Sequence, residues 1–141
     1  MKRLAIILFA LPLLLLLPSS ATGQTLRDSN NRSIGSVESN GNIRDDSNRQ
    51  IGRIESNGTV RDSNNRQIGR IESDGTVRDG NNRQIGRVEA NGTVRDGNNR
   101  QIGSIDSDGT VRDGSNRQLG KARGVSRRHA AVFFFFFDMM R

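Results

Sequence analysis

The fold is decided by a 17-residue stretch, residues 68–84, which reads IGRIESDGTVRDGNNRQ. The next copy, residues 85–101, differs from it only at Val88, Ala90 and Asn91. Equivalent positions recur at a constant spacing of 17, at Gln24, Gly41, Gly58, Gly75, Gly92 and Gly109. Self-similarity at a fixed period is typical of a repeat architecture, in which each unit buries its apolar face against its neighbours.

Three apolar positions recur in each repeat, and most of them hold β-branched residues, which favour strands. Gly and Asn recur too often for helices. We therefore predict an all-β fold of hairpins. The predicted core combines repeat side chains with the Phe residues near the C-terminus: Ile51, Ile54, Val60, Ile68, Ile71, Val77, Ile85, Val88, Val94, Phe133, Phe134, Phe135, Phe136 and Phe137.

Two kinds of three-residue turn alternate along the repeats. One ends in Gly75 and its equivalents, which suits a type I turn with a G1 bulge and a left-handed Gly. The other ends in Asn82 and its equivalents, and Asn is the best non-Gly residue for a left-handed position. These loop lengths predict that Ile71 lies opposite Val77 and that Val77 lies opposite Ile85.

The alternation of faces fails between Ile85 and Val88, which are three residues apart. A flat strand would send these two side chains to opposite faces. We expect Gly86 between them, and the equivalent Gly of each repeat, to permit a bend or bulge that turns Val88 inward.

Five complete units follow a half-unit at residues 24–33, and each begins one residue before the Gly that permits the bend. They are residues 34–50, 51–67, 68–84, 85–101 and 102–118. A single hairpin is marginal in water. We predict that the hairpins close into a propeller-like ring, which removes exposed strand edges, with the half-unit beside the last copy. The alternative is an open β-solenoid with capped ends.

Residues 1–23 have the pattern of a secretory signal peptide: Lys2 and Arg3, an apolar run, then small residues up to Gly23. We expect cleavage before Gln24, with a cut after Ala21 or an uncleaved anchor as alternatives. The predicted organisation is a signal peptide at 1–23, a repeat domain at 24–120 and a tail at 121–141. The expected location is secreted, periplasmic or on the outer cell surface.

The charge is unevenly distributed along the chain. The net charge is +7, of which Lys2 and Arg3 contribute two units, and there is no Cys. Residues 24–120 hold 15 Arg and 14 acidic residues, whereas the tail holds five basic residues and only Asp138. A nearly neutral repeat domain argues against nucleic-acid binding, which needs a one-sided basic face. No nucleic acid, cofactor or disulfide is predicted, and a monomer is expected.

The tail contains five consecutive Phe residues at 133–137, the only aromatic residues after residue 23. The repeat side chains alone make a small core, so we predict that the tail packs inside the ring. Ser126 is a candidate N-cap for a short helix, although a Phe run also suits a strand. The alternative is that Phe side chains with Arg127 and Arg128 contact a membrane.

The repeated phrase Ile-Gly-x-Ile-Glu-x-Asp/Asn-Gly-Thr-Val-Arg-Asp, between a predicted signal peptide and a Phe-rich end, resembles that of the secreted bacterial five-fold β-flower proteins, chiefly of Bacteroidetes. The resemblance covers roughly residues 24–137 and implies fivefold closure and secretion. The family has no assigned activity, so no catalytic residue is carried over. Asn65, Asn82 and Asn99 stand where the family is expected to have Gly.

Catalytic and metal-binding patterns are weak. His129 has no partner nearby in sequence, and Asp79-Gly80-Asn81-Asn82 lacks the alternation and closing Glu of an EF-hand calcium loop. Glycosidases use paired carboxylates, and each repeat supplies one acid, but identical copies offer no environment that separates two pKa values. No catalytic or metal-binding residue is predicted, and these acids are expected to pair with Arg across strands: Glu38, Glu55, Glu72, Glu89 and Asp106.

We therefore predict a secreted, non-enzymatic binding or structural module with an unknown ligand. The first alternative is a module that binds carbohydrate or anionic polymer through a column of turn Arg residues, provided that they gather on one face: Arg49, Arg66, Arg83, Arg100 and Arg117. The weaker alternative is a glycan hydrolase that uses the repeated acids.

Overall fold

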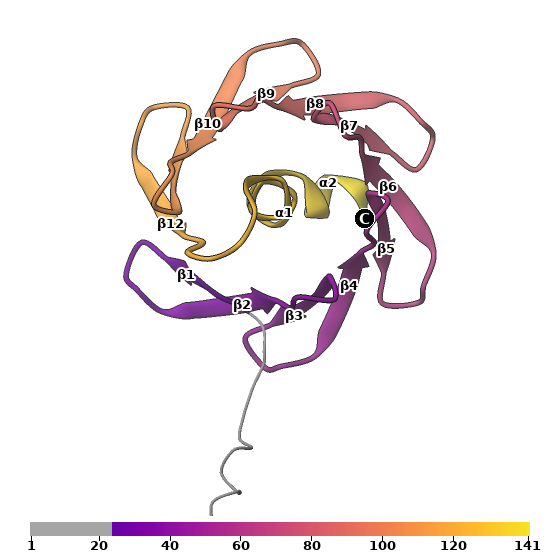
Figure 1. The fold of residues 1–141 in the computed structure, drawn as a ribbon, viewed down its shortest axis with the longest axis horizontal. Coiled ribbons are helices and arrows are strands. Elements are labelled where there is room, and N and C mark those ends of the chain that lie inside the picture. The colour runs from indigo at the N-terminus through magenta and orange to yellow at the C-terminus, as the bar shows by residue number, and fades with distance from the viewer. Residues whose placement is uncertain (1–23) are drawn as a thin grey trace, which may run out of the picture.

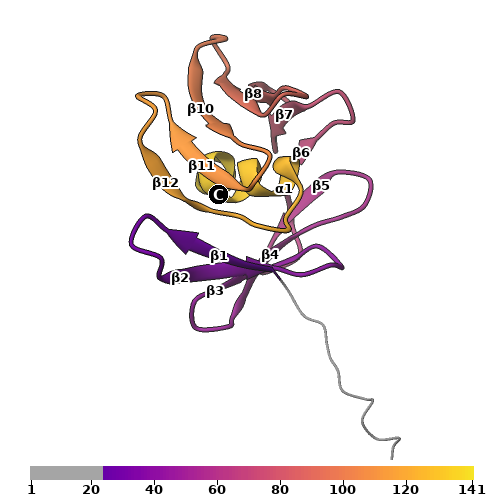
Figure 2. The ribbon, with the colours of Figure 1, turned by 60° about the vertical axis from the view of Figure 1, so that its left-hand side comes forward.

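The structure is a computed structural model that describes residues 24–141. The predicted signal peptide lies outside the described residues. Twelve short strands form a ring around the helical tail (Figures 1 and 2). The strands are β1 (Gln24–Asp28), β2 (Ser33–Val37), β3 (Asn42–Asp45), β4 (Gln50–Ile54), β5 (Thr59–Asp62), β6 (Gln67–Ile71), β7 (Thr76–Asp79), β8 (Gln84–Val88), β9 (Thr93–Asp96), β10 (Gln101–Ile105), β11 (Thr110–Asp113) and β12 (Gln118–Lys121).

The ring is closed by its first and last strands. Every strand pairs antiparallel with its neighbours in chain order, and β1 pairs with β12 through Arg27 opposite Lys121 and Asp28 opposite Gly120. The five complete repeats supply β2 to β11, the initial half-unit supplies β1, and the residues that follow the last complete repeat supply β12. The prediction of a closed ring is confirmed, and the open solenoid is excluded.

Both turn predictions are confirmed. Gly75 and its four equivalents have φ between 91° and 96°, and the N–H of Gly75 donates to the carbonyl of Glu72 at 2.9 Å. Asn82 has φ 69°, and its N–H donates to the carbonyl of Asp79 at 3.0 Å. The second kind of turn occurs six times, each with a left-handed Asn, so Asn fills the place where the family was expected to have Gly.

The strand register differs from the prediction by one residue. Ile71 lies opposite Val77 as expected, but Val77 lies opposite Gly86 rather than Ile85. The register shifts between Val77 and Arg78, which face Gly86 and Gln84, so Ile85 is the extra residue of a bulge. Gly86 and Val88 are therefore two apart on the inner face, and both are buried.

The bulge also explains the burial of the predicted core. The strand residues Ile54, Val60, Ile71, Val77, Val88 and Val94 are buried, as are Phe136 and Phe137, and Ile68 is the one bulged residue of the predicted core that is also buried. The bulged residues Ile51 and Ile85, and also Phe133, Phe134 and Phe135, are half-buried and pack against this core.

The tail forms a short helix inside the ring (Figure 1). It consists of α1 (Arg127–Ala131), a π-helical segment η3 (Val132–Phe136) and α2 (Phe137–Met140). The Ser126 hydroxyl accepts a hydrogen bond from the His129 N–H at 3.1 Å, which confirms the predicted N-cap. The Phe run is thus helical, and its packing inside the ring is as predicted.

Each inner-face Gly of the ring is in contact range of one tail side chain. A Cβ atom at any of these positions would lie within about 3.1 Å of the facing side chain. The pairs are Gly35 with Phe133, Gly52 with Phe137, Gly69 with Met140, Gly86 with Phe136, Gly103 with Phe135, and Gly120 with Phe134. Each of these Gly residues directly follows the bulge. Because it has no side chain, it also leaves the space that a tail side chain occupies.

Candidate functional site

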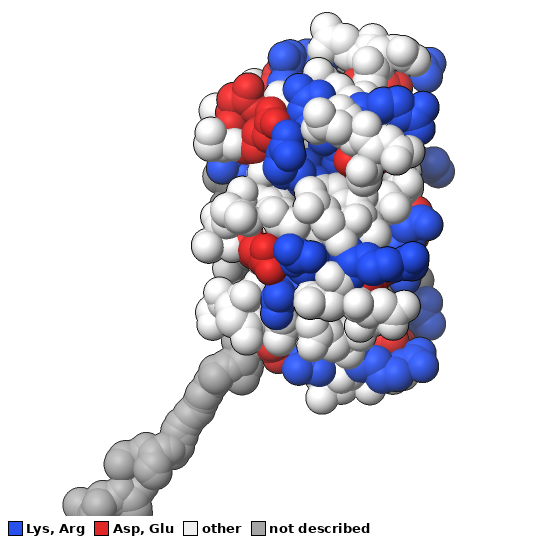
Figure 3. All heavy atoms as spheres, turned by 90° about the vertical axis from the view of Figure 1, so that its right-hand side faces the viewer, with Lys and Arg blue, Asp and Glu red and all other residues white. Residues whose placement is uncertain are grey.

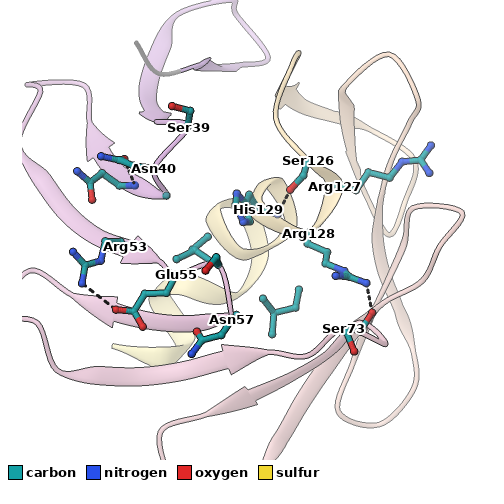
Figure 4. Close-up of a pocket in the computed structure, with 16 residues that line it drawn as sticks. Ser39, Asn40, Arg53, Glu55, Asn57, Ser73, Ser126, Arg127, Arg128 and His129 are labelled. Carbon is teal, nitrogen blue, oxygen red and sulfur yellow. Dashed lines mark hydrogen bonds and ion pairs between the residues drawn. The ribbon is translucent and has the colours of Figure 1, made fainter. Parts of the chain in front are cut away.

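A hollow of about 1120 Å³ opens beside the N-terminal end of α1 (Figure 4). It arises because α1 is off-centre in the ring and packs against β8 and β10. Arg127 Nη1 donates to the Ala90 carbonyl at 2.9 Å, and the Arg128 guanidinium donates to the Ser73 carbonyl. These bonds hold the helix toward one side and leave the space next to the turns that follow β2 and β4.

The wall formed by the turns is rich in hydrogen-bond donors. Asn40 Oδ1 accepts the Asn42 N–H at 3.1 Å, and Asn57 Oδ1 accepts the Thr59 N–H at 3.0 Å. The amide oxygens thus hold the turns, and each Nδ2 group is left with two donors. Hydroxyl groups and two apolar side chains complete the lining: Ser39, Ser56, Ser73, Ser126, Ile54 and Ile71.

The charge around the hollow is positive. Arg53, Arg127 and Arg128 line it, and Glu55 is the single acidic residue in the lining. Glu55 Oε2 accepts from Arg61 and from Arg53 Nη2, each at 3.0 Å, and these hydrogen bonds hold the pKa of Glu55 below its usual value. The carboxylate is therefore already engaged. The α1 guanidinium held at a lining residue is that of Arg128, on Ser73, whereas the Arg127 side chain points away toward Ala90 (Figure 4).

His129 lies in the lining opposite Asn40 and Asn57 (Figure 4). Burial, and next the charge of Arg128, lower the pKa of His129, so the imidazole is neutral near pH 7. Within residues 24–141, no group of three His, Asp or Glu side chains is placed to hold a metal ion. His129 can contribute a neutral donor or acceptor to the hollow.

The five Arg residues predicted to bind an anion are placed elsewhere, on five of the six Asn turns. Each pairs with the Asp four residues before it at 3.3 Å, and each side chain is 77–83% exposed. Arg49 and Arg66 line a second, smaller recess with Arg141, and none of the predicted Arg residues lines the hollow. Their charge is compensated by Asp within the same turn.

The repeated acids pair with Arg across the strands, as predicted. Glu38, Glu55, Glu72, Glu89 and Asp106 each lie 2.9–3.3 Å from the Arg six residues later. Hydrogen bonds from Arg lower the pKa of Glu72 and Glu89 as well as that of Glu55. A glycosidase needs one carboxylic acid with a raised pKa, and these three carboxyl groups are shifted in the opposite direction.

Acidification is expected to destabilise the ring in two steps. The pKa of His129 is lowered in the folded state, so its contribution to stability is complete above pH 6.5 and is lost as the pH falls through the folded pKa. The Asp residues of the Asn turns accept backbone N–H groups, which lower their pKa, so their contribution is complete above pH 3.8 and is lost below it.

The measurement is the melting temperature as a function of pH, for the native chain and for His129→Gln. The variant should lose the step that lies below pH 6.5 and keep the one that lies below pH 3.8. A melting temperature that does not change through the acidic range would contradict both assignments.

Sequence reasoning did not find the hollow. Its residues belong to a turn that looks alike in every repeat, and the off-centre position of α1 selects which turns line it. Asn40 and Asn57 are neutral where two later repeats have Asp74 and Asp108, but Asn91 is neutral as well and lies outside the lining, so this difference did not single out the hollow. None of the helices among residues 24–141 has the length and apolar character needed to cross a membrane.

Twelve antiparallel strands, built from a 17-residue repeat and filled by the helical tail, define an all-β ring of tandem hairpins. The sequence model of the family described as "5-fold beta-flower protein" matches residues 23–138, and the chain belongs to this family. That description names an architecture and no reaction. No curated protein and no solved structure matches the chain.

Proposed function

We propose that the chain is a secreted, non-enzymatic binding module whose ligand occupies the hollow. The ligand class is a compact polar molecule with hydroxyl groups and an anionic group, such as an acidic sugar. The observation that supports this is the lining itself, in which amide and hydroxyl donors lie beside the Arg128 guanidinium, which is paired with no acid in the described chain.

The chemistry of the site favours binding over catalysis. The one acid in the lining, Glu55, is held by two Arg residues, and His129 has no carboxylate partner to orient it. Hydrogen bonds to charged groups are stronger than neutral ones. Arg128 therefore supplies the attraction for an anion, and the Asn and Ser groups supply its orientation.

The proposal of secretion is supported by the pattern of residues 1–23 and by the start of the repeats at Gln24. A module that recognises acidic sugars fits this location.

The test exploits a natural variation of the repeat. Asn40→Asp together with Asn57→Asp keeps the side-chain oxygen that accepts the turn N–H, because Asp74 and Asp108 make the same bond at 3.0 Å. The change removes donors and brings two negative charges to the hollow. We expect binding to acidic sugars on a glycan array, measured at low and at near-physiological salt, to weaken at least about tenfold.

The matched control is Asn98→Asp combined with Asn64→Asp, the same charge change on the Asn turns at the other end of the ring. Its binding should stay within about threefold of that of the native chain. Equal losses in both double variants, or an array without any acidic sugar bound at low salt, would contradict the proposal.

A further inference from the structure

The outer wall of the ring carries three Arg–Glu–Arg groups on consecutive hairpins. Arg53 lies directly opposite Arg61, Arg70 opposite Arg78, and Arg87 opposite Arg95. In each group one glutamate oxygen, Oε2 of Glu55, Glu72 or Glu89, accepts hydrogen bonds from both guanidinium groups at 2.9–3.2 Å. Each group therefore keeps one net positive charge.

Among the described strands this Arg–Glu–Arg arrangement occurs in one sector of the ring, from β4 to β9, whereas the closure of the ring places Arg27 opposite Lys121 without an acid between them. In the flanking hairpins, Ser36 faces Arg44 and Ser104 faces Arg112, so a single Arg pairs with a single acid there. Figure 3 looks at the side that carries β5 and β6, where basic side chains cover more of the surface than acidic ones. We call the outer face of β4–β9, with its three Arg–Glu–Arg groups, the basic wall.

The basic wall is regular and accessible. Successive groups are two strands apart, which corresponds to about 10 Å along the ring. Arg53, Arg70 and Arg87 are 38–42% exposed. Asn82 Oδ1 also accepts a hydrogen bond from Arg70 Nη2 at 3.2 Å, and Asn65 Oδ1 accepts one from Arg53 Nη2 at 3.5 Å. These contacts hold the guanidinium groups in place before any ligand arrives.

We propose that the basic wall binds a linear acidic polysaccharide, whose carboxylate or sulfate groups lie on successive Arg–Glu–Arg groups. A row of fixed cationic groups along a curved surface matches a flexible chain that carries anionic groups at regular intervals. Guanidinium groups suit carboxylate and sulfate oxygens because they donate two parallel hydrogen bonds. One of its three groups shares Arg53 and Glu55 with the lining of the hollow, whereas Arg70, Arg87 and their glutamates lie outside that lining, so the proposal does not depend on the function proposed for the hollow.

Two other polyanions fit the basic wall less well. Proteins that bind single-stranded nucleic acids stack bases on aromatic side chains, and every aromatic residue among residues 24–141 belongs to the Phe run inside the ring. An anionic membrane is nearly flat on this scale, whereas the basic wall curves around the ring. A flat surface would contact the middle Arg–Glu–Arg group and would not reach the two groups on either side of it.

The test uses the triple variant Arg53→Ser, Arg70→Ser and Arg87→Ser, and also the double variant Arg70→Ser and Arg87→Ser, which leaves Arg53 in the lining of the hollow unchanged and should lose binding as well. Ser already occupies this strand position in two hairpins, as Ser36 and Ser104, so the ring should fold. Each Glu would keep one Arg partner, as Glu38 does. The control is Arg66→Ser, Arg83→Ser and Arg100→Ser, which removes the same charge from exposed turns.

The probes are polygalacturonate and dextran sulfate, with neutral dextran as the blank, and the readout is Kd over a series of salt concentrations. The basic-wall variant should bind at least about tenfold more weakly with a shallower salt dependence. The turn variant should stay within about threefold. Replacing the same three residues with Lys should give intermediate binding, because the charge remains and the paired hydrogen bonds do not.

Equal losses in the basic-wall and turn variants would overturn the proposal, because net charge alone would then explain binding. Tighter binding to a single-stranded oligonucleotide or to anionic vesicles than to either polysaccharide would overturn it too. Loss of polysaccharide binding in the Asn40→Asp, Asn57→Asp variant with an unaffected basic-wall variant would assign the polymer to the hollow instead.

Discussion

A chain that ends at Val132 should lose the cooperative thermal unfolding of the ring. Removal of residues 133–141 deletes five Phe side chains and Met140, which together face all six inner-face Gly residues. A buried Phe contributes about 3–5 kcal/mol when it is truncated to Ala. The sum for this segment exceeds the free energy of unfolding of a typical domain, about 5–15 kcal/mol, so the emptied ring is not expected to persist.

The interior offers no substitute for the tail. The strand residues that face inward are Val, Ile, Leu and Gly, and the inner-face Gly residues would be left facing an empty space. The measurement is thermal unfolding followed by circular dichroism. Phe136→Ala, at a side chain with no exposed area, should lower the free energy of unfolding by about 3–5 kcal/mol.

The control is Met139→Gln. Met139 is 56% exposed, and its substitution should change the free energy of unfolding by less than about 0.5 kcal/mol. An unchanged melting temperature in the truncated chain would contradict the packing of the tail as the centre of the core.

The second large effect is expected for Gly86→Ala. The new Cβ would lie 2.5 Å from the Arg95 carbonyl oxygen and 2.5 Å from Phe136 Cζ, inside any normal contact distance. Overpacking of a core typically costs about 1–3 kcal/mol. We expect Gly86→Ala to lower the free energy of unfolding by about 3 kcal/mol or more. A movement of the Phe136 side chain alone cannot relieve the contact with the Arg95 carbonyl oxygen.

Denaturant unfolding of a double-mutant cycle separates the two contacts. Phe136→Leu relieves the contact with the ring, so Gly86→Ala should cost less in the Phe136→Leu background than in the native one. Gly97→Ser is the control, because Gly97 occupies a turn position where Ser63 stands in another repeat. Additive effects of Gly86→Ala and Phe136→Leu would contradict their direct contact.

Most of the architecture is predictable from the repeat. Val77, Gly75 and Asn82 define the strands and the two turn types by local rules that each copy repeats, and ring closure follows from the need to cover strand edges. The Ser126 cap is local as well. These features depend on residues close together in the sequence, where period and turn chemistry carry the information.

The register and the site were less accessible for a different reason. Val77 faces Gly86 because the packed tail needs space at the Gly, and that requirement comes from Phe136, 50 residues away. The hollow depends on the position of α1 within the ring. Two hydrogen bonds fix that position, from Arg127 and Arg128 to carbonyl groups that are distant in the sequence. Neither effect can be recognised from the sequence of a single repeat.

The pairing of six Gly positions with six tail side chains has an evolutionary consequence. Tandem repeats usually gain and lose units by duplication and deletion, since each unit contacts only its neighbours. Here an added unit of 17 residues would bring a further Gly with no side chain to face, and a lost unit would leave one tail side chain without a place. The number of repeats can change only if the tail changes with it, so in this chain the two parts must be inherited as one.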